Sequence, residues 1–544
     1  MRRAIRAVAV FVIALTFVGL AAGAQHCRPC HPDLPGTRAF TVTGSVTRYA
    51  FAGEHVVVEW TRSAGCSGTA VWDFRTASRA QASAVCQRTS RSGAGTSATK
   101  LVASQGNRSV RIVLAPPAVD RPDRLEVLDR ASRRLVASWP LIDRPGRLAL
   151  YDDIAVLSSA NRSALYALRI SDGRIALLGI TQPGDRPLIG PAGVLYQDDL
   201  DVSKNRSAAS RMFANAAQSE IAERRVTLKL LPLATVRREL SRAGRPIQTS
   251  TINAISMDGP RVAFAVSDPR GSCDRVLFWN IPWHFVSRLT QASGPTCLPS
   301  HQPGGITDVA IAGSRAVWTT QYGHTTRVLA ASIIKCEEWV VARPGTRVQR
   351  VAGLAGDGGV LTYALTPGRA SRGGTSSVGF VPRAWRGAQL VSSSNATVAV
   401  SVDSDRVAIL HGDGTVAVVT RAGLPVGRVH LAGARAIALR RDTLAVLTPG
   451  RLGMYRVRTG ERVAIWNVAP GATSVDLHYG IALITAGPDV YALDVETGRT
   501  AHLLRAPART TAELEAPGAV VQFNAGGHGH LRFLSMSWIE ARTR

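Results

Sequence analysis

Residues 26–32 read HCRPCHP and contain the motif Cys-x-x-Cys-His at Cys27, Cys30 and His31. This spacing attaches a c-type haem, because the two thiols form thioether bonds and the histidine becomes an axial ligand of the iron. The motif follows a chain end, where segments are usually loose, and strand-like sequence begins soon after it. We therefore predict a disulfide at this motif, either between its two cysteines or from one of them to Cys336, with haem c as the alternative.

The first 24 residues have the layout of a secretory signal peptide. Arg2, Arg3 and Arg6 form a positive start, residues 7–23 are apolar and uncharged, and AGA at 22–24 supplies small residues for cleavage. We predict export from a bacterial cell, cleavage after this triplet, and an extracellular or cell-envelope location without a remaining membrane span. An uncleaved anchor is the alternative, since the apolar run is almost long enough to cross a bilayer.

A second group of residues that could do chemistry is the acidic cluster at Asp198, Asp199 and Asp201. Carboxylates of this kind bind calcium, but the order Asp-x-Asp-x-Asp-Gly of a calcium loop is missing, and a solvated loop is the favoured interpretation. The sequence has no Gly-x-Ser-x-Gly, His-Glu-x-x-His or phosphate-loop motif. We predict no catalytic residues and no cofactor.

Most of the chain has the pattern of short β-strands. Apolar, β-branched runs such as RVAFAV at 261–266 are bounded by Gly, Asp, Asn or Pro. Gly423, Gly460 and Gly498 occupy equivalent turns 37 and 38 residues apart. A unit of this length holds four strands, which is one propeller blade, and blades arranged in a ring bury each other's faces.

The repeat is contained in a larger internal duplication. LYALRISDGRIALL at 165–178 matches VYALDVETGRTAHL at 490–503, and VVEWTRSAGCSGTAVWDF at 57–74 matches AFAVSDPRGSCDRVLFWNI at 263–281. The starts of the two halves are closer in register than the ends by about three repeat units. The second half is therefore expected to contain about three more blades than the first.

Four cysteines fall at corresponding points of the two halves. Cys66 corresponds to Cys273, and Cys86 to Cys297. Since exported proteins usually hold their cysteines as disulfides, we predict the bonds Cys66–Cys86 and Cys273–Cys297. Each closes a loop of some twenty residues, for which the loop-entropy model gives ~3 kcal/mol.

The segments VYALDVETGR (490–499), MYRVRTGERVAIW (454–466) and LYALRISDGR (165–174) resemble the repeats of secreted bacterial β-propellers of the WD40-like and quinoprotein-like (PQQ-like) type. The resemblance covers most of residues 45–540 as a style of repeat, and it implies a propeller. Quinoprotein dehydrogenases have a tryptophan at a fixed place in each of eight blades, and here Trp466 and Trp139 fall at such a place. Their metal and quinone site is not found, so no catalytic residue is carried over.

The fold class expected is all-β, as two propellers related by duplication, with a larger single ring as the alternative. We divide the chain into a signal peptide (1–24), an N-terminal segment (25–44), an array of about four units (45–245, with an insertion near 198–225) and a seven-bladed propeller (248–540).

The charge balance bears on partners. The formal net charge is +27, and all but four of the 65 basic residues are arginine. The arginines are scattered without a basic block, so we expect a general attraction to anionic polymers and no specific nucleic-acid binding. The favoured function is a non-enzymatic scaffold that binds a protein, a peptide or a cell-envelope polymer. The alternative is a propeller enzyme, either a glycan hydrolase or lyase or a quinone- or haem-dependent redox protein. Buried carboxylates with shifted pKa values in the central channel would count against the scaffold.

Overall fold

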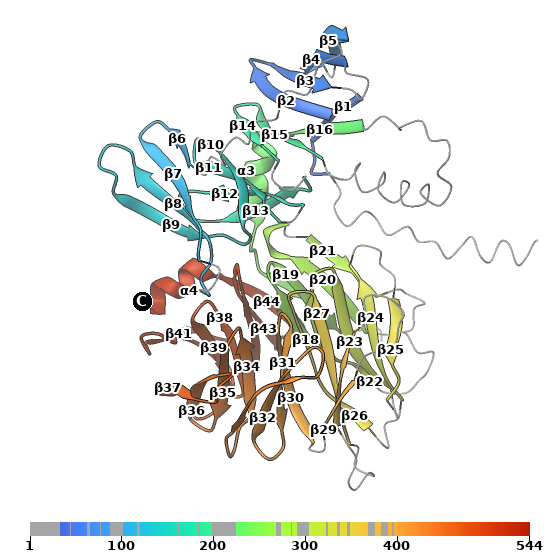
Figure 1. Ribbon diagram of the computed structural model, residues 1–544, viewed down its shortest axis with the longest axis vertical. Coiled ribbons are helices and arrows are strands. Elements are labelled where there is room, and N and C mark those ends of the chain that lie inside the picture. Colours follow the sequence, from blue (N-terminus) through green and yellow to red (C-terminus); the bar gives the residue numbers. More distant parts are fainter. Residues whose placement is uncertain are drawn as a thin grey trace, which may run out of the picture.

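The computed structural model shows two groups of four-stranded antiparallel sheets (Figure 1). The structure describes residues 33–43, 45–61, 66–76, 78–86, 102–116, 120–161, 163–181, 185–198, 225–267, 274–283, 285–290, 304–322, 325–333, 338–344, 349–367, 376–381, 390–393 and 396–543. The cysteines at 27, 30, 273, 297 and 336, together with the signal peptide, lie outside these residues. Within the described part, no helix is both long and apolar enough to cross a membrane.

The first group, which we call the N-terminal array, has four sheets with the strand orders β2-β3-β4-β5, β6-β7-β8-β9, β10-β11-β12-β13 and β1-β16-β15-β14. The bounds are β1 Arg38–Thr43, β2 Ser45–Ala52, β3 His55–Thr61, β4 Cys66–Asp73, β5 Ser78–Cys86, β6 Val102–Gln105, β7 Arg108–Val113, β8 Arg124–Asp129, β9 Leu135–Pro140, β10 Pro145–Tyr151, β11 Ile154–Ser159, β12 Leu165–Arg169, β13 Ile175–Gly179, β14 Leu188–Gly190, β15 Gly193–Gln197 and β16 Arg225–Pro232, followed by helix α3 Leu233–Arg242.

The second group contains seven sheets, each with its strands in sequence order except the last, β17-β44-β43-β42. The bounds are β17 Ile247–Thr249, β18 Ile252–Asp258, β19 Arg261–Val266, β20 Arg275–Asn280, η2 Ile281–Trp283, β21 Phe285–Arg288, β22 Gly304–Ala312, β23 Arg315–Tyr322, β24 Thr325–Ser332, β25 Glu338–Ala342, β26 Gln349–Asp357, β27 Val360–Pro367, β28 Ser376–Phe380, β29 Leu390–Ser393, β30 Thr397–Asp403, β31 Arg406–His411, β32 Thr415–Thr420, β33 Pro425–His430, β34 Ala436–Arg440, β35 Thr443–Thr448, β36 Arg451–Arg456, β37 Arg462–Asn467, β38 Ser474–His478, β39 Ile481–Ala486, β40 Asp489–Asp494, β41 Thr500–Arg505, β42 Thr510–Glu515, β43 Gly518–Ala525, β44 His528–Ser535 and helix α4 Met536–Thr543.

These seven sheets form a closed ring, the propeller. Seven separate hydrophobic clusters each join two neighbouring sheets, and one of them joins the last sheet to the first. Strand β17 completes the last sheet by pairing with β44, so the start of the ring is tied to its end. Asn524 adds to this closure, because its side chain bonds both the N–H and the carbonyl of Ile252 at 2.9 Å. The prediction of an all-β fold with a seven-bladed propeller is confirmed.

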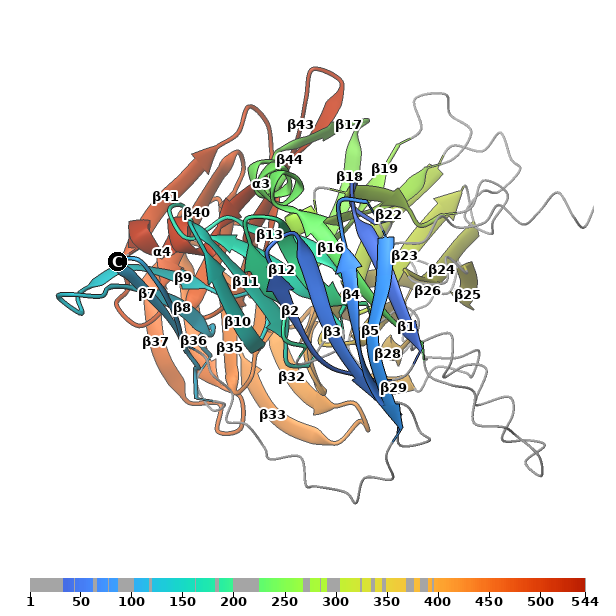
Figure 2. The same ribbon diagram turned by 90° about the horizontal axis from the view of Figure 1, so that it is seen from above.

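The N-terminal array is joined as a row. Three hydrophobic clusters connect its sheets in the order β6–β9, β10–β13, β14–β16 with β1, and β2–β5. Among the described residues, none of these clusters connects the sheet β2–β5 to the sheet β6–β9, and these two sheets lie at the ends of the row (Figures 1 and 2). Both groups end in the same way, with a strand that leads directly into a helix. The origin of the two groups by duplication remains a prediction.

The repeated glycines lie at the turn between the third and fourth strands of their sheets, with positive φ at Gly423, Gly460 and Gly498. The indole of Trp466, which belongs to the preceding sheet, packs against Gly498. A Cβ at Gly498 would lie 2.6 Å from the indole nitrogen, so a larger residue would displace the ring. Trp139 lies in the same way over Gly173 in the N-terminal array. The two tryptophans singled out in the sequence therefore lock adjacent sheets.

This contact makes a testable prediction about stability. Gly498→Ala should destabilise the propeller by ~2 kcal/mol or more, since the left-handed backbone (φ +75°) and displacement of Trp466 both add cost. Gly450→Ala is the matched control, because Gly450 has φ +72° and no atom within 4 Å of the added Cβ. The control should lose only ~1 kcal/mol. Equal losses in urea unfolding would show that the tryptophan contact contributes nothing.

Candidate functional site

The innermost strands of the propeller surround a central channel, and ionisable residues gather at one of its ends. Each inner strand ends at a hairpin, and its last residue occupies the same position in all seven sheets. We call these seven residues the mouth ring: Asp258, Ala312, Asp357, Asp403, Arg440, His478 and Glu515. Six of the seven are ionisable, although ionisable side chains are rarely buried unless they have a partner.

Each of the three aspartates of the mouth ring connects its own sheet to the following sheet. Asp258 accepts the N–H of Gly313, and Arg261 donates to the carbonyl of the same Gly313 at 2.6 Å. Asp403 and Arg406 bind the N–H and the carbonyl of Arg441 in the same manner. In both hairpins of the form Asp-x-x-Arg, the aspartate binds the N–H and the arginine binds the carbonyl of one residue in the first turn of the following sheet.

A second layer of side chains makes the same kind of connection deeper in the channel. The carboxylate of Asp308 accepts the N–H of Leu354 at 2.9 Å, and Asp476 accepts that of Leu514 at 2.7 Å. Two serines do this with hydroxyl groups, as Ser401 does for Leu439. Because buried backbone N–H groups need acceptors, these side chains have a structural role in the ring.

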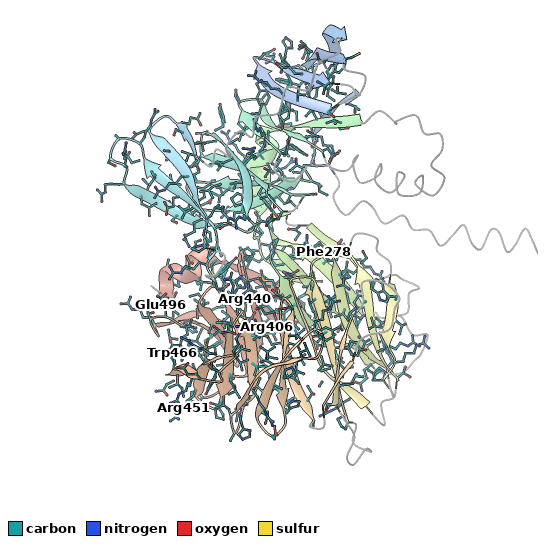
Figure 3. The ribbon with its side chains drawn as sticks, in the orientation of Figure 1. Phe278, Arg406, Arg440, Arg451, Trp466 and Glu496 are labelled. Atoms are coloured by element: carbon teal, nitrogen blue, oxygen red, sulfur yellow. The ribbon has the colours of Figure 1, made fainter. Side chains whose placement is uncertain are left out.

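Arg440 is the central cation of the mouth ring. Its guanidinium lies 3.4 Å from carboxylate oxygens of both Asp357 and Asp403, and 3.4 Å from the ring nitrogen Nε2 of His478. Figure 3 shows Arg440 at the end of the propeller that faces the N-terminal array. The fourth neighbour comes from that array: Asp120 lies 3.4 Å from Arg440.

Asp120 lies between β7 and β8 in the sequence and also contacts the residue that follows His478 of the mouth ring. Its second oxygen accepts the N–H of Tyr479 at 2.8 Å. Close by, Arg124 makes two bonds to the buried carboxylate of Glu540 in α4, at 3.1 and 3.2 Å. The N-terminal array therefore contacts the mouth ring and α4 through charged side chains.

A prediction follows for this contact. Asp120→Ala should speed hydrogen exchange of the Tyr479 amide about tenfold, because a hydrogen bond to a charged group contributes ~1.5–3 kcal/mol. The amide of Leu514, which is bonded within the propeller, should be unchanged. Arg121→Gln is the control, since its ion pair with Glu496 is largely exposed and of little energetic weight. Unchanged protection at Tyr479 would contradict the contact.

Burial shifts the pKa values of the channel carboxyl groups upward. It raises the pKa of Asp308 to about 6 and that of Asp357 to about 7, where Asp258 and Asp403 add repulsion and Arg440 partly opposes the shift. The pKa values of Glu513 and Glu515 are raised well above their ordinary range by burial and by neighbouring carboxylates. Burial and the two nearby arginines lower the pKa of His478, so this imidazole is neutral.

These groups can hold a proton or a cation. Carboxylate oxygens of Asp258, Asp357 and Glu515 lie within 4.8 Å of one another, and oxygen ligands suit calcium or magnesium. The channel cavity has a volume of about 230 Å³, which fits an ion with its water or a small molecule and not a polymer. Carboxyl groups with raised pKa values in the channel were expected to count against a pure scaffold. Asp308 and Asp357 are such groups.

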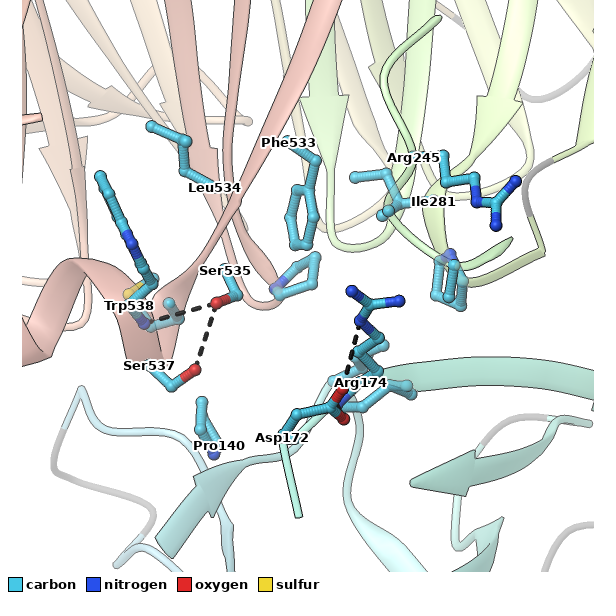
Figure 4. A pocket seen from close by; sticks show the side chains of 18 of the residues that line it. Pro140, Asp172, Arg174, Arg245, Ile281, Phe533, Leu534, Ser535, Ser537 and Trp538 are labelled. Atoms are coloured by element: carbon cyan, nitrogen blue, oxygen red, sulfur yellow. Dashed lines mark hydrogen bonds and ion pairs between the residues drawn. The ribbon is translucent and has the colours of Figure 1, made fainter. Parts of the chain in front are cut away.

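A second cavity lies outside the channel, in the cleft between the N-terminal array and the propeller (Figure 4). Its volume is about 520 Å³. Asp172 and Arg174 stand on the wall formed by the array, and Ile281, Phe533 and Trp538 stand on the propeller wall. Cavities of this size at the junction of two structural units are common ligand sites.

The residues singled out in the sequence lie elsewhere. Cys66 is disulfide-bonded and lies directly opposite Cys86 in the register of β4 and β5, which is suitable for the predicted bond, although the pairing itself stays a prediction. Asp198 is buried and pairs with Lys229 at 2.7 Å, whereas the other two aspartates of its cluster, Asp199 and Asp201, lie outside the described residues. The predicted Cys273–Cys297 bond and the haem motif also lie outside them.

Sequence reasoning missed the mouth ring. Its successive members are separated by 37 to 54 residues, and its three aspartates read as ordinary turn residues when taken alone. The repeated Asp-x-x-Arg at 258–261 and 403–406, just before a second apolar strand, is the signal that could have found two of them.

No protein-family model matches the sequence, and no curated protein matches it. Among solved structures, a chain in the crystal structure of the mitotic checkpoint complex is 17% identical over 54% of this chain and 92% of its own, with a TM-score of 0.40. Sqt1 from Saccharomyces cerevisiae is 9% identical over 54% of this chain and 98% of its own, with a TM-score of 0.36. No functional inference follows from similarity at this level, and the fold assignment rests on the sheets themselves.

Proposed function

We propose that the protein is an exported, non-enzymatic β-propeller scaffold that binds a protein, a peptide or a cell-envelope polymer. The proposal rests on one observation: carboxylates of the channel bind the backbone of the neighbouring sheet. Each accepts a backbone N–H of the next sheet, as seen at Asp258, Asp308, Asp403 and Asp476. Groups committed in this way hold the ring rigid, and a rigid ring that presents loops suits binding.

Export and the division of the chain at about residue 245 are part of the same proposal. Export is inferred from the signal-like residues 1–24, and the division of the chain is inferred from the spacing of the repeats. The mass of the exported protein tests export and cleavage together with the haem motif. A mass equal to residues 25–544 less the protons of two or three disulfides supports the proposal. A mass heavier by one haem that survives reduction would make the chain an electron-transfer protein.

A second candidate function is acid–base catalysis on a small molecule in the channel. It is favoured by the pKa of about 7 at Asp357, since a carboxyl group that titrates near neutral pH can both accept and donate a proton. The small channel volume speaks against a polymeric substrate.

The two functions separate in one experiment on the full exported chain. Purified cell-wall glycan and its small fragments are incubated with the protein, and both bound material and newly formed reducing ends are measured. The scaffold predicts no new reducing ends, and any glycan that is bound should bind equally to Asp357→Asn. New reducing ends that disappear in Asp357→Asn would overturn the scaffold and establish the enzyme.

A further inference from the structure

The cleft between the N-terminal array and the propeller has an excess of positive charge. Within the part of the chain that the structure describes, three arginines and a single carboxylate line it: Arg174, Arg245, Arg532 and Asp172. The carboxylate is already shared, because Asp172 pairs with Arg169 at 2.9 Å and with Arg174 at 3.3 Å. The charge of the other two arginines is therefore not balanced inside the cleft.

Two of these arginines retain free donors. Arg245 gives its Nε to the carbonyl of Ser241 at 3.1 Å, at the end of α3, and both of its Nη groups have no acceptor among the described residues. Arg532 is exposed, and its side chain forms no hydrogen bond or ion pair with the described part of the chain. Free guanidinium groups are well suited to paired bonds with carboxylates.

The propeller wall adds apolar surface and further donors. Phe533 and Trp538 present aromatic rings, and the guanidinium of Arg542 lies 3.6 Å from the centre of the Trp538 ring, which fixes that ring in place. Ser535 caps the first turn of α4 by accepting the N–H of Trp538 at 3.4 Å, and Ser537 lies 3.2 Å from it (Figure 4). The positive end of α4 thus also faces the cleft.

We propose that this cleft binds an acidic peptide segment of a partner protein, with its carboxylates on Arg245 and Arg532 and an apolar side chain against Phe533 and Trp538. This inference rests on the proposed scaffold function and names its ligand. A peptide is favoured over an anionic polymer because aromatic rings and prolines (Pro140, Pro246, Pro282 and Pro517) form much of the lining. A polyphosphate has no apolar group to bury against them.

The test is a fluorescence-anisotropy titration of the full exported chain with a labelled nine-residue peptide of glutamates around one phenylalanine. Arg245→Gln/Arg532→Gln should weaken binding at least tenfold. Arg428→Gln/Arg451→Gln is the matched control, since it removes two exposed arginines of the propeller that do not line the cleft. The control should bind like the wild type, and Trp538→Ala should weaken binding several-fold.

Three results would overturn the inference. Absence of peptide binding would do so, as would equal weakening in both double variants, which reports only the general attraction of a chain with charge +27. The third is arginine-dependent binding of polyphosphate without binding of the peptide, which would assign the cleft to an anionic polymer. These failures are distinct from failure of the proposed function, which is shown by turnover of glycan and not by loss of this ligand.

Discussion

Replacing Arg440 by methionine lowers the free energy of unfolding of the propeller by ~3 kcal/mol or more at pH 8, because removal of one partner leaves buried charges uncompensated. Arg440 is the guanidinium nearest to the carboxylates of Asp120, Asp357 and Asp403. Methionine fills a similar volume, so the loss reports the charge and not an empty space. The measurement is urea unfolding of the full chain followed by circular dichroism.

The control for this variant is Arg451→Met, at the opposite end of the propeller (Figure 3), where the arginine is exposed and has no ion pair with any described residue. It should change the unfolding free energy by less than ~0.5 kcal/mol. The deficit of Arg440→Met should also shrink at pH 6, where Asp357 and its neighbours take up protons. A deficit that is equal in both variants, or independent of pH, would contradict the central role of Arg440.

The second large effect is a dependence of stability on pH. The native pKa values of Asp308 and Asp357 are about 6 and 7, above the ordinary 3.8, so the folded protein binds more protons than the unfolded chain between about pH 4 and 7. Glu513 and Glu515 add to this excess. Stability therefore falls as pH rises through the native pKa values.

The lowered pKa of His478 acts in the opposite direction, since the unfolded chain binds its proton below about pH 6.5. Between pH 6 and 8 the carboxyl groups outnumber it, and we expect the protein to be more stable at pH 6 by on the order of 2 kcal/mol. For a propeller of about 300 residues this corresponds to a melting temperature higher by roughly 3 °C.

Glu513→Gln isolates part of this effect. The side chain of Glu513 has no hydrogen-bond or ion-pair partner among the described residues, and nearby Asp476 and Asp308 disfavour its charge. The variant should be more stable than the wild type at pH 8 by ~1 kcal/mol and nearly equal to it at pH 6. Glu461→Gln, at an exposed surface pair, serves as the control. Lower stability of Glu513→Gln at pH 8 would show that this carboxylate is needed in its charged form.

Local sequence predicted the parts of the fold that depend on near neighbours. The glycine spacing located the turns between third and fourth strands, because a tight turn with positive φ needs glycine whatever surrounds it. Trp139 and Trp466 stood out in the sequence by their places in the repeat, but their contacts with Gly173 and Gly498 are known only from the structure. Repeats of this kind identify the four-stranded blade, and blades that must bury each other's faces are expected to pack as a ring.

The site depends on distant neighbours and could not be predicted in this way. The mouth ring needs seven inner strands in a common register, and its raised pKa values arise from burial that only the closed ring produces. Ring closure itself depends on β17, a strand of three residues without a distinctive pattern. The cleft is formed by residues more than 350 positions apart, such as Asp172 and Phe533, and depends on the placement of the two arrays.

The central claim is that the channel holds the ring together and the cleft binds the partner. Hydrogen exchange of the full chain with and without the acidic phenylalanine peptide tests it most directly. The account predicts slower exchange at residues 243–246 and 532–538, which line the cleft, and no change in the inner strands β26, β38 and β42. Protection confined to these inner strands would place the ligand in the channel and contradict the account.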